Sequence, residues 1–324
     1  MTEHDEQFAC MGTTVRLVIS ASTADLSPAA AAAADARRRL EEFDRRLSRC
    51  REDSELSALN ADERTAVPAS ALLCTAVGAG LWAAERTGGL VDPTLVDALE
   101  AVGYARSRAG AQPIALESAL ALAPPRRPAR PSPQAAWQRV RVDPDRGFVY
   151  RPPGVRIDTG GTGKGLVADM VASRLGDRRR FVVDCGGDLR IGGSGAAEFP
   201  YEIEVVHPLT GEGVQTLHVG SGGVATSGID RRAWATPEGG CAHHLLDPST
   251  GLPAWTGLVG ATALAPTALE ADVLAKAAVL SGPAGARTLL RRHGGILFHD
   301  DGRVERVAVP IPRAAMRAFM TVRS

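Results

Sequence analysis

The feature that most constrains the fold is a glycine-rich segment in the middle of the chain, Asp158–Asp169. It reads Asp-Thr-Gly-Gly-Thr-Gly-Lys-Gly-Leu-Val-Ala-Asp, so four glycines in six positions surround Lys164. Apolar residues then recur at helical spacing up to Leu175, and the strand-like stretch 155–157 precedes the glycines. This order predicts a strand, a glycine turn and a helix. Backbone N–H groups at such a helix start can approach a phosphate closely, because no Cβ atoms stand in the way.

Two familiar nucleotide-binding patterns do not match this segment. A P-loop requires G-x-x-x-x-G-K-[ST], but Asp158 stands at the position of its first glycine and Gly165 follows the lysine. The dinucleotide fingerprint G-x-G-x-x-G is not met by the glycines at 161, 163 and 165 either. On this segment alone, a glycine-rich turn with a solvated Lys164 therefore stays open as an alternative to a phosphate site.

Composition narrows the classes of protein to consider. Lys plus Arg and Asp plus Glu number 37 each, and 4% of residues are aromatic, so neither a charge field nor base-stacking platforms favour nucleic acid. No apolar run reaches about 18 residues, so we expect no membrane span. The polar, acidic N-terminus does not resemble a secretion signal. The five cysteines lack C-x-x-C spacing, so we expect reduced thiols in a cytoplasmic protein and neither disulfides nor a zinc site.

Helical patterns dominate the first part of the chain and strand patterns the second. Helices are expected at 27–47, 68–86, 95–102, 267–280 and 284–293, and strands at 12–19, 180–184, 189–191, 201–206, 215–219 and 259–264. This order predicts the α+β class in a single compact unit over residues 1–324. The stretch 104–133 is rich in proline and arginine and is predicted to be an exposed, mobile connection. Solvated arginines are favoured there over a nucleic-acid patch, because no aromatic residue lies among them.

Several further clusters combine glycine with Asp, Thr or His, which suits a backbone that wraps around a polyanionic ligand. Each cluster also has a simpler structural interpretation. Residues 184–188, Asp-Cys-Gly-Gly-Asp, are by themselves typical of a hairpin turn. His243 and His244 could form a metal pair, but neighbours on a strand point to opposite faces. One histidine facing the site and one elsewhere is therefore expected.

The order of these clusters resembles that of the ApbE family of FAD:protein FMN transferases. The matching motifs are Cys10-Met11-Gly12-Thr13, Asp53-Ser54-Glu55-Leu56-Ser57-Ala58-Leu59-Asn60, Val91-Asp92-Pro93-Thr94, Asp158-x-Gly160-Gly161-x-x-Lys164-Gly165, Gly186-Gly187-Asp188, Thr226-Ser227-Gly228, His244-Leu245-Leu246-Asp247-Pro248-x-Thr250-Gly251 and Ala271-Asp272-x-Leu274-Ala275. The resemblance covers nearly the whole chain, from Cys10 to the helix at Asp272. It implies an ApbE-like (T-fold-like) fold of mixed antiparallel sheets with helices packed around them.

The resemblance also implies an activity. FAD would be the substrate, its pyrophosphate would be cleaved, and FMN would pass to a threonine or serine hydroxyl of an acceptor flavoprotein while AMP leaves. A divalent metal, usually Mg²⁺, assists in the family. The metal and Lys164 would neutralise charge as the P–O bond to AMP breaks.

Roles for individual residues follow from the same resemblance. Asp272, Lys164 and His244 would be catalytic. The implied FAD-binding residues are Met11, Val91, Asp92, Thr94, Asp158, Gly160, Gly161, Lys164, Ser227, Gly228, Leu246 and Asp247. The implied metal site combines Gly161 and Asp272 with Ala275 and Lys276 further along the same helix.

Two residues depart from the family pattern. Lys276 stands where a Thr or Ser hydroxyl usually joins the metal, and a protonated lysine has no lone pair with which to replace it. At i, i+4 from Asp272 it could form a surface ion pair worth roughly 0.3–0.5 kcal/mol. Alternatively, its ammonium could occupy part of the metal's place and leave a weaker or absent Mg²⁺ site. Cys50 stands where an aromatic residue is common, which is expected to weaken FAD binding by about 1 kcal/mol.

Two other functions therefore stay open beside FMN transfer. One is an FAD-binding protein without transferase activity, which Lys276 would favour. The other is an FAD pyrophosphatase, in which water replaces the acceptor hydroxyl. The sequence identifies neither the acceptor protein nor the general base.

Overall fold

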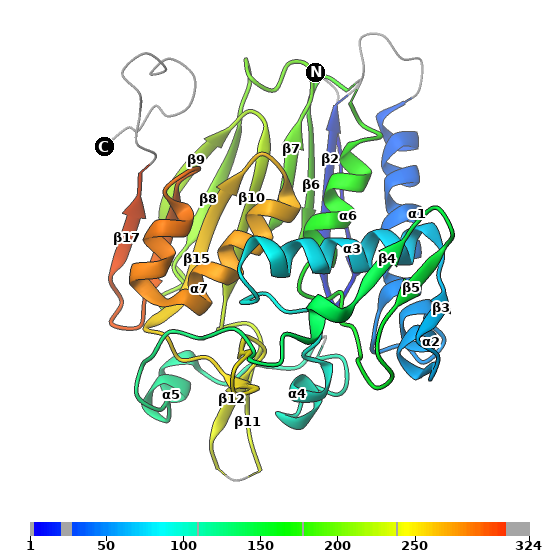
Figure 1. The fold of residues 1–324 in the computed structure, drawn as a ribbon. Helices are drawn as coiled ribbons and strands as arrows, with labels where there is room; N and C mark the ends of the chain where they lie inside the picture. Colours follow the sequence, from blue (N-terminus) through cyan, green and yellow to red (C-terminus); the bar gives the residue numbers. More distant parts are fainter. Residues whose placement is uncertain (1–2, 21–27, 109, 177, 238, 309–324) are drawn as a thin grey trace.

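The computed structural model describes residues 3–20, 28–108, 110–176, 178–237 and 239–308. Its centre is a large sheet of eight strands: β1 (Glu3–Cys10), β2 (Thr13–Ser20), β6 (Phe181–Cys185), β7 (Asp188–Gly192), β10 (Gly222–Gly228), β15 (Leu258–Ala265), β16 (Gly295–His299) and β17 (Val304–Val307). The strands lie side by side in this order, and every neighbouring pair is antiparallel (Figure 1). The expected α+β class with antiparallel sheets is confirmed.

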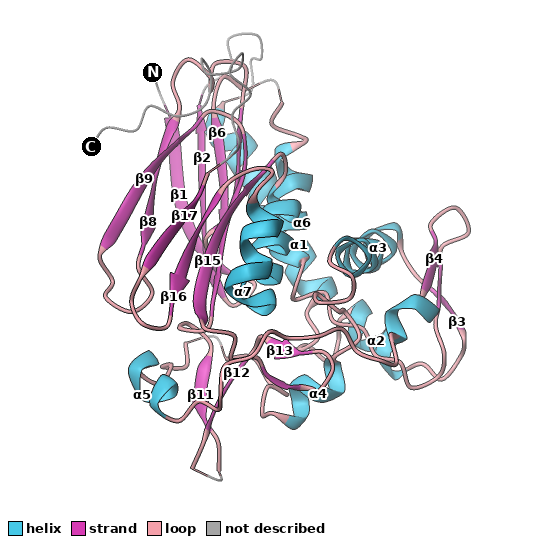
Figure 2. Cartoon of the chain, turned by 60° about the vertical axis from the view of Figure 1, so that its left-hand side comes forward, coloured by secondary structure: helices cyan, strands magenta, loops and turns pink. Residues whose placement is uncertain are grey.

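Three helices cover one face of this sheet. They are α1 (Ala29–Leu47), α6 (Gly163–Ala172) and α7 (Ala268–Leu290), and Figure 2 shows them on the opposite side from the hairpin of β8 (Tyr201–Val206) and β9 (Gly213–Val219). One hydrophobic core joins α7, the sheet and this hairpin. A second core packs α1 and α6 against β2 and β6. The sheet is therefore covered on both faces.

The first helix shows why the sequence pattern is reliable here. Its buried residues are Ala33, Ala36, Leu40, Phe43 and Leu47, and their spacing of three or four places them on one face. Two arginines in the last turn complement the negative end of the helix dipole. The helix predicted at 27–47 is confirmed from position 29 onward, and residue 27 lies outside the described residues.

Smaller elements surround the large sheet and the layers that cover it. Beside α1 lie α2 (Glu55–Ala61), α3 (Ala71–Arg86) and a small sheet of β3 (Ala66–Pro68), β5 (Phe148–Tyr150) and β4 (Arg141–Asp143). Below the large sheet in Figure 1 lie α4 (Val96–Ala101), α5 (Leu116–Ala121) and the pair of β11 (Ala233–Ala235) and β12 (Cys241–His243). A 3₁₀ helix spans Ala136–Arg139, and β13 (Leu246–Asp247) pairs with β14 (Leu252–Pro253). These elements place loops around one end of the sheet.

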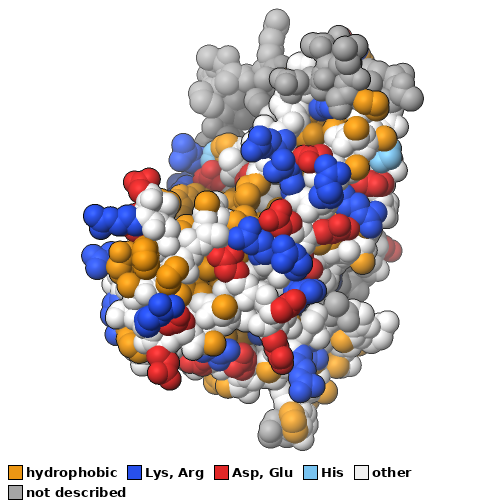
Figure 3. Space-filling view, turned by 90° about the vertical axis from the view of Figure 1, so that its right-hand side faces the viewer, with side chains coloured by type: hydrophobic (Ala, Val, Ile, Leu, Met, Phe, Trp, Pro, Cys, Tyr) orange, Lys and Arg blue, Asp and Glu red, His pale blue; other side chains and the backbone are white. Residues whose placement is uncertain are grey.

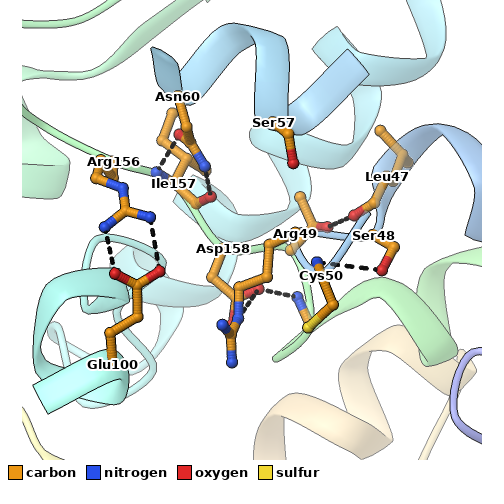
Figure 4. A network of polar contacts seen from close by, with 12 residues as sticks. Leu47, Ser48, Arg49, Cys50, Ser57, Asn60, Glu100, Arg156, Ile157 and Asp158 are labelled. Atoms are coloured by element: carbon orange, nitrogen blue, oxygen red, sulfur yellow. Dashed lines mark hydrogen bonds and ion pairs between the residues drawn. The ribbon is translucent and has the colours of Figure 1, made fainter. Parts of the chain in front are cut away.

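The strand expected at 155–157 is absent, and this prediction was wrong. The backbone of Ile157 is instead paired by a side chain: its N–H donates to Oδ1 of Asn60 at 2.7 Å and its C=O accepts from Nδ2 at 2.8 Å (Figure 4). A β-branched stretch needs backbone partners to become a strand. Here the amide of Asn60 pairs both backbone groups of Ile157, so this residue has partners without joining a sheet.

The last helix bends where the sequence predicts a break between two helices. Residue Gly282 lies inside α7 with φ of 68° and ψ of 177°, and Pro283 follows it. Proline lacks the N–H that would continue the helical ladder, so the helix kinks at this point. The two predicted helices are thus the two arms of α7.

The stretch 104–133 contains α5 and runs largely over the surface. Two backbone hydrogen bonds join it to distant segments. Arg127 N donates to Trp255 O and Ala129 N donates to Leu280 O, both at 2.9 Å. The side chain of Arg126 is also paired with Asp300 at 2.6 Å. The mobility of this stretch stays a prediction.

The surface and the thiols agree with the composition. On the face in Figure 3, Lys and Arg side chains alternate with Asp and Glu, so this face carries no field of one sign. All five cysteines are free. Among the described helices, none combines the length and the apolar character that a membrane crossing would need.

Candidate active site

A cleft of about 1220 Å³ opens where the β1–β2 and β6–β7 turns meet the end of β10 and the start of α6. Small-molecule sites usually measure about 300–1000 Å³, so this cleft has room for a dinucleotide such as FAD. Its walls also include the segment after α1, the turn at 91–93, part of the loop 104–111, and residues 226–228, 230–232 and 244–246. Segments far apart in the sequence thus form one site.

The glycine-rich segment forms part of the cleft wall. All residues from Asp158 to Lys164 line the cleft, and α6 begins at Gly163 within the segment. A Cβ atom added at Gly161 would meet no heavy atom within 4 Å, so the backbone there faces open space. The predicted glycine turn followed by a helix is confirmed. The positive end of the α6 dipole lies at the cleft, where it favours an anion.

Lys164 is held by a carboxylate. Its ammonium forms a hydrogen-bonded ion pair with Asp188, which is buried at the start of β7. Burial lowers the pKa of Lys164, but the carboxylates of Asp188 and Asp272 outweigh that effect and hold the pKa above its usual value. Lys164 is therefore a fixed positive charge in the cleft wall, and the alternative of a solvated lysine is wrong.

A second lysine–carboxylate pair lies beside the first, on α7. Lys276 Nζ donates to Oδ1 of Asp272, one helical turn earlier. Asp272 is 0% exposed and Lys276 is 8% exposed, so the alternative of a surface ion pair is wrong. Burial and the neighbouring Asp188 raise the pKa of Asp272, while Lys276 and Lys164 act in the opposite direction. The four groups therefore form one electrostatic cluster.

The two histidines divide as expected. His244 lines the cleft, and burial followed by the charge of Arg232 lowers the pKa of His244 well below its usual value. Its ring is therefore neutral near pH 7, and its buried Nδ1 has no partner among the described residues. His243 does not line the cleft and packs edge-on against Trp255, with ring centroids 4.7 Å apart.

An arginine organises the rim of the cleft beside the glycine segment. Arg49 Nε lies 3.5 Å from Oδ1 of Asp158, and its guanidinium lies 4.7 Å from the ring centroid of Tyr104. Figure 4 shows Arg49 next to Asp158, with Cys50 beside it. Cys50 is exposed and lines the cleft. The aromatic side chain on this part of the rim therefore comes from Tyr104.

The other predicted site residues fall into two groups. Those on the cleft wall are Met11, Val91, Asp92, Asp158, Gly160, Gly161, Ser227, Gly228 and Leu246. Those that do not line the cleft are Thr94, Asp247, Asp272 and Ala275. Thr94 donates to Asp92 from both its N–H and its hydroxyl, and Asp247 accepts from the N–H groups of Arg130 and Ser249. These two residues shape turns behind the wall.

Sequence reasoning assigned no role to three residues of the site. Asp188 stands in a matched motif, but nothing in the sequence shows that it is the partner of Lys164. Arg49 is one of many arginines, and only its contacts with Asp158 and Tyr104 distinguish it. Tyr104 begins the stretch expected to be a mobile connection, so its position in the cleft had no signal in the sequence.

The residues around Asp272 do not fit a divalent cation. A metal at this carboxylate would compete with the Lys276 ammonium that already occupies it and would lie near Lys164 as well. At an effective dielectric constant of about 20, a divalent cation and an ammonium about 4 Å apart repel each other by roughly 8 kcal/mol. Ala275 offers no side-chain ligand, and among the described residues no group of three or more His, Cys, Asp or Glu could hold a metal. The site is instead built on two lysine–carboxylate pairs.

Comparison with known proteins identifies relatives that match most of the chain. A protein of Klebsiella pneumoniae named FAD:protein FMN transferase is 30% identical over 294 residues, which cover 88% of this chain and 80% of that protein. A protein of Salmonella typhimurium with the same name is 28% identical over 78% of this chain and 71% of its own length. The crystal structure of the ApbE protein of Thermotoga maritima is 26% identical with a TM-score of 0.77, covering 94% of this chain and 97% of that one.

A further solved structure shares the fold, and a family model gives the assignment. The fold is also shared with the flavin transferase ApbE of Vibrio cholerae, at a TM-score of 0.71 and 22% identity over 95% of this chain and 97% of that one. The model of the ApbE family matches residues 11–298, which include all the predicted site residues. This chain therefore belongs to the ApbE family.

Proposed function

We propose that this protein transfers FMN from FAD to a threonine or serine hydroxyl of an acceptor flavoprotein and releases AMP. The curated relatives are named for an FAD:protein FMN transfer. The observation that carries the proposal is the position of Lys164 and Lys276 on the wall of one cleft that has room for a dinucleotide. Each ammonium has three N–H donors, of which its carboxylate needs only one, and charge-assisted hydrogen bonds to phosphate oxygens are strong.

In the proposed reaction the acceptor hydroxyl oxygen attacks the phosphorus of the FMN half of FAD. A new P–O bond forms to the acceptor, and the bond from that phosphorus to the bridging oxygen breaks. AMP leaves with the bridging oxygen and its electron pair, and the hydroxyl proton is released. Negative charge grows on the leaving oxygen during this step, so positive groups placed there in advance lower the barrier.

Each group in the cleft has a task in this proposal. Lys164 donates to the diphosphate and neutralises its charge, and Asp188 keeps the ammonium in place. The neutral ring of His244 offers its unpartnered Nδ1 to the incoming hydroxyl or to a phosphate oxygen. Met11 lines the adenine end of the cleft, and the backbone of Leu246 contacts FAD.

The test incubates the purified protein with FAD, with and without a candidate acceptor flavoprotein. AMP is followed by chromatography, and protein-bound flavin by fluorescence in a denaturing gel. We expect AMP only with the acceptor, together with a fluorescent acceptor band. AMP without any acceptor would show a pyrophosphatase, and unaltered bound FAD would show a binding protein; either result contradicts the proposal.

A matched pair of variants tests the role of Lys164. We expect Lys164→Met to lower the rate of AMP release about 100-fold, the usual cost of losing one group that stabilises transition-state charge. Arg64→Met removes a side chain that is 65% exposed and does not line the cleft, so it should leave the rate unchanged. Equal rates in both variants would exclude Lys164 from the reaction.

The cytoplasmic location expected from the sequence stays a prediction.

A further inference from the structure

The ammonium of Lys276 is paired with the carboxylate of Asp272, the group at which the family resemblance leads us to expect a divalent cation. We propose that the ammonium of Lys276 replaces the divalent cation, so that this protein binds FAD and transfers FMN without a divalent metal ion. The proposal rests on the proposed function, because it concerns the same cleft and the same diphosphate. It is carried by three features of the site: the order of the charged groups, their balance, and the choice of lysine.

The first feature is the order of the groups as a ligand meets them. Lys276 lines the cleft, whereas Asp272 is fully buried and does not line it. A ligand in the cleft therefore meets the ammonium first and the carboxylate only behind it. A cation bound by Asp272 would need the opposite order, with the carboxylate facing the cleft. An anionic ligand fits the order that exists.

The second feature is the charge balance of the cluster. Lys276 is paired with Asp272 and Lys164 with Asp188, so two positive and two negative charges already compensate each other. Each lysine ammonium has three N–H donors, and only one is needed for its carboxylate. Two donors on each lysine remain for phosphate oxygens. The two buried carboxylates are therefore balanced without a metal, and the remaining lysine donors are available to bind a dianionic diphosphate.

The third feature is the choice of residue. The chain has 37 Lys and Arg residues, and Lys164 and Lys276 are its only lysines. Both of them lie in this cleft. Arginine is a planar fork with a delocalised charge, whereas lysine carries a compact point charge on a flexible stem. All remaining residues among the 37 are arginines. Lysine is thus kept for the two positions where a small cation is required.

In the transfer step Lys276 acts by charge and hydrogen bonding alone. It forms no covalent bond and gives up no proton. Its ammonium donates to diphosphate oxygens in bound FAD and stabilises the charge that develops as the bridging oxygen leaves with AMP. A protonated lysine has no lone pair, so it cannot serve as a metal ligand at the same time.

The first experiment needs no variant. FAD is titrated into the whole protein in excess EDTA and, separately, with Mg²⁺, and binding is followed by the change in flavin fluorescence. We expect the two Kd values to agree within about threefold, which is less than 1 kcal/mol of binding free energy. A Kd that is more than threefold weaker in EDTA would overturn the proposal.

Two variants then test Lys276 itself. In Lys276→Thr we expect FAD binding in EDTA to weaken about tenfold, the loss expected for one charge-assisted hydrogen bond, and to recover with Mg²⁺ because Asp272 is released. Unchanged binding of this variant in EDTA would refute the role of Lys276. Removing only one partner leaves a buried charge unpaired. The double variant Asp272→Asn/Lys276→Met leaves no unpaired charge, so its fold should be intact. Its FAD binding should still be weaker than that of the wild type, with or without Mg²⁺.

The readouts separate this proposal from the proposed function. If acceptor-dependent AMP release requires Mg²⁺, the role of Lys276 is refuted while FMN transfer stands. If no AMP is released under any condition but FAD binds equally well in EDTA and Mg²⁺, FMN transfer is refuted while the role of Lys276 in binding stands. Equal AMP release in EDTA and Mg²⁺ supports both.

Discussion

Lys164 and Lys276 are held in position by buried carboxylates. A free lysine on a glycine loop or on a helix surface would be a solvated charge of little consequence. Asp188 and Asp272 instead fix both ammonium groups at the cleft. The pairing costs solvation, because the carboxylates are buried. A bound diphosphate would be recognised by charges that are already in position.

Arg49 offers a test at the scale of one residue. Its guanidinium holds the carboxylate of Asp158 and covers the ring of Tyr104. We expect Arg49→Ala to weaken FAD binding about tenfold, because the rim loses a charge-assisted contact and its fixed geometry. Titration of FAD into the variant measures this change.

The conservative variant Arg49→Lys is the control for charge. Lysine keeps the positive charge but cannot stack its ammonium as a planar fork. The affinity of the Arg49→Lys variant for FAD should therefore lie between those of the wild type and Arg49→Ala. If Arg49→Ala binds FAD as tightly as the wild type, the rim contact has no part in recognition.

At the scale of elements, the site depends on how closely α6 approaches the start of α7. Gly165 lies in the first turn of α6, and a Cβ atom there would lie 2.7 Å from both the carbonyl oxygen of Ala268 and the Cα of Leu269. Both contacts are with backbone, which cannot turn away as a side chain can. Asp169 of α6 then accepts from the N–H groups of Ala268 and Leu269, at 2.9 Å each. This contact sets Lys164 and Lys276 beside each other.

Replacement of Gly165 tests this contact. We expect Gly165→Ala to lower the free energy of unfolding by about 1–3 kcal/mol, the usual cost of inserting a methyl group into a packed region. Urea unfolding followed by circular dichroism measures the change. The result also bears on the glycine-rich segment, since one of its glycines then serves helix packing and not the ligand.

The matched control is Gly78→Ala in α3. No heavy atom lies within 4 Å of a Cβ placed at Gly78, and this residue is in a helix. The same chemical change should therefore raise the free energy of unfolding there, by about 0.4–1 kcal/mol. Destabilisation of equal size at both positions would mean that close packing is not the reason for Gly165.

At the scale of the whole molecule, stability should depend on pH through a buried histidine. Burial lowers the pKa of His243 to about 3, whereas an unfolded chain would titrate near pH 6.5. Below about pH 6.5 the unfolded chain takes up a proton that the folded protein refuses, so stability falls as pH falls toward 3. From pH 7 to pH 5 this group alone should lower the free energy of unfolding by about 2 kcal/mol. Urea unfolding at the two pH values measures the decrease.

The variant His243→Asn is the control for this effect. Nδ1 of His243 accepts a hydrogen bond from Leu245 N at 3.3 Å, and an asparagine oxygen can accept in the same way. Asparagine does not titrate, so the decrease in stability between pH 7 and pH 5 should be smaller by about 2 kcal/mol in the variant. An unchanged decrease would assign the pH dependence to other groups.

Most of the elements predicted from local patterns in the sequence are present in the structure. Helix α1 follows from an apolar face at helical spacing, and the glycine turn before α6 follows from its residues. Strand β1 was not predicted, because its first residues are charged and only Phe8 and Cys10 are buried. The stretch 155–157 was misread as a strand, because the side chain of Asn60 satisfies its backbone from 97 positions away.

The sequence by itself determined the family motifs, the class of fold and the presence of a lysine at position 276. Only the tertiary structure decided that this lysine is buried on Asp272 and faces the cleft, and that Asp188 holds Lys164 beside it. The reason is physical: periodicity and turn residues act over a few positions, whereas the pairing of charges depends on which segments the sheet and helices bring together. A carboxylate at 188 and a lysine at 164 meet only after α6 packs against β7.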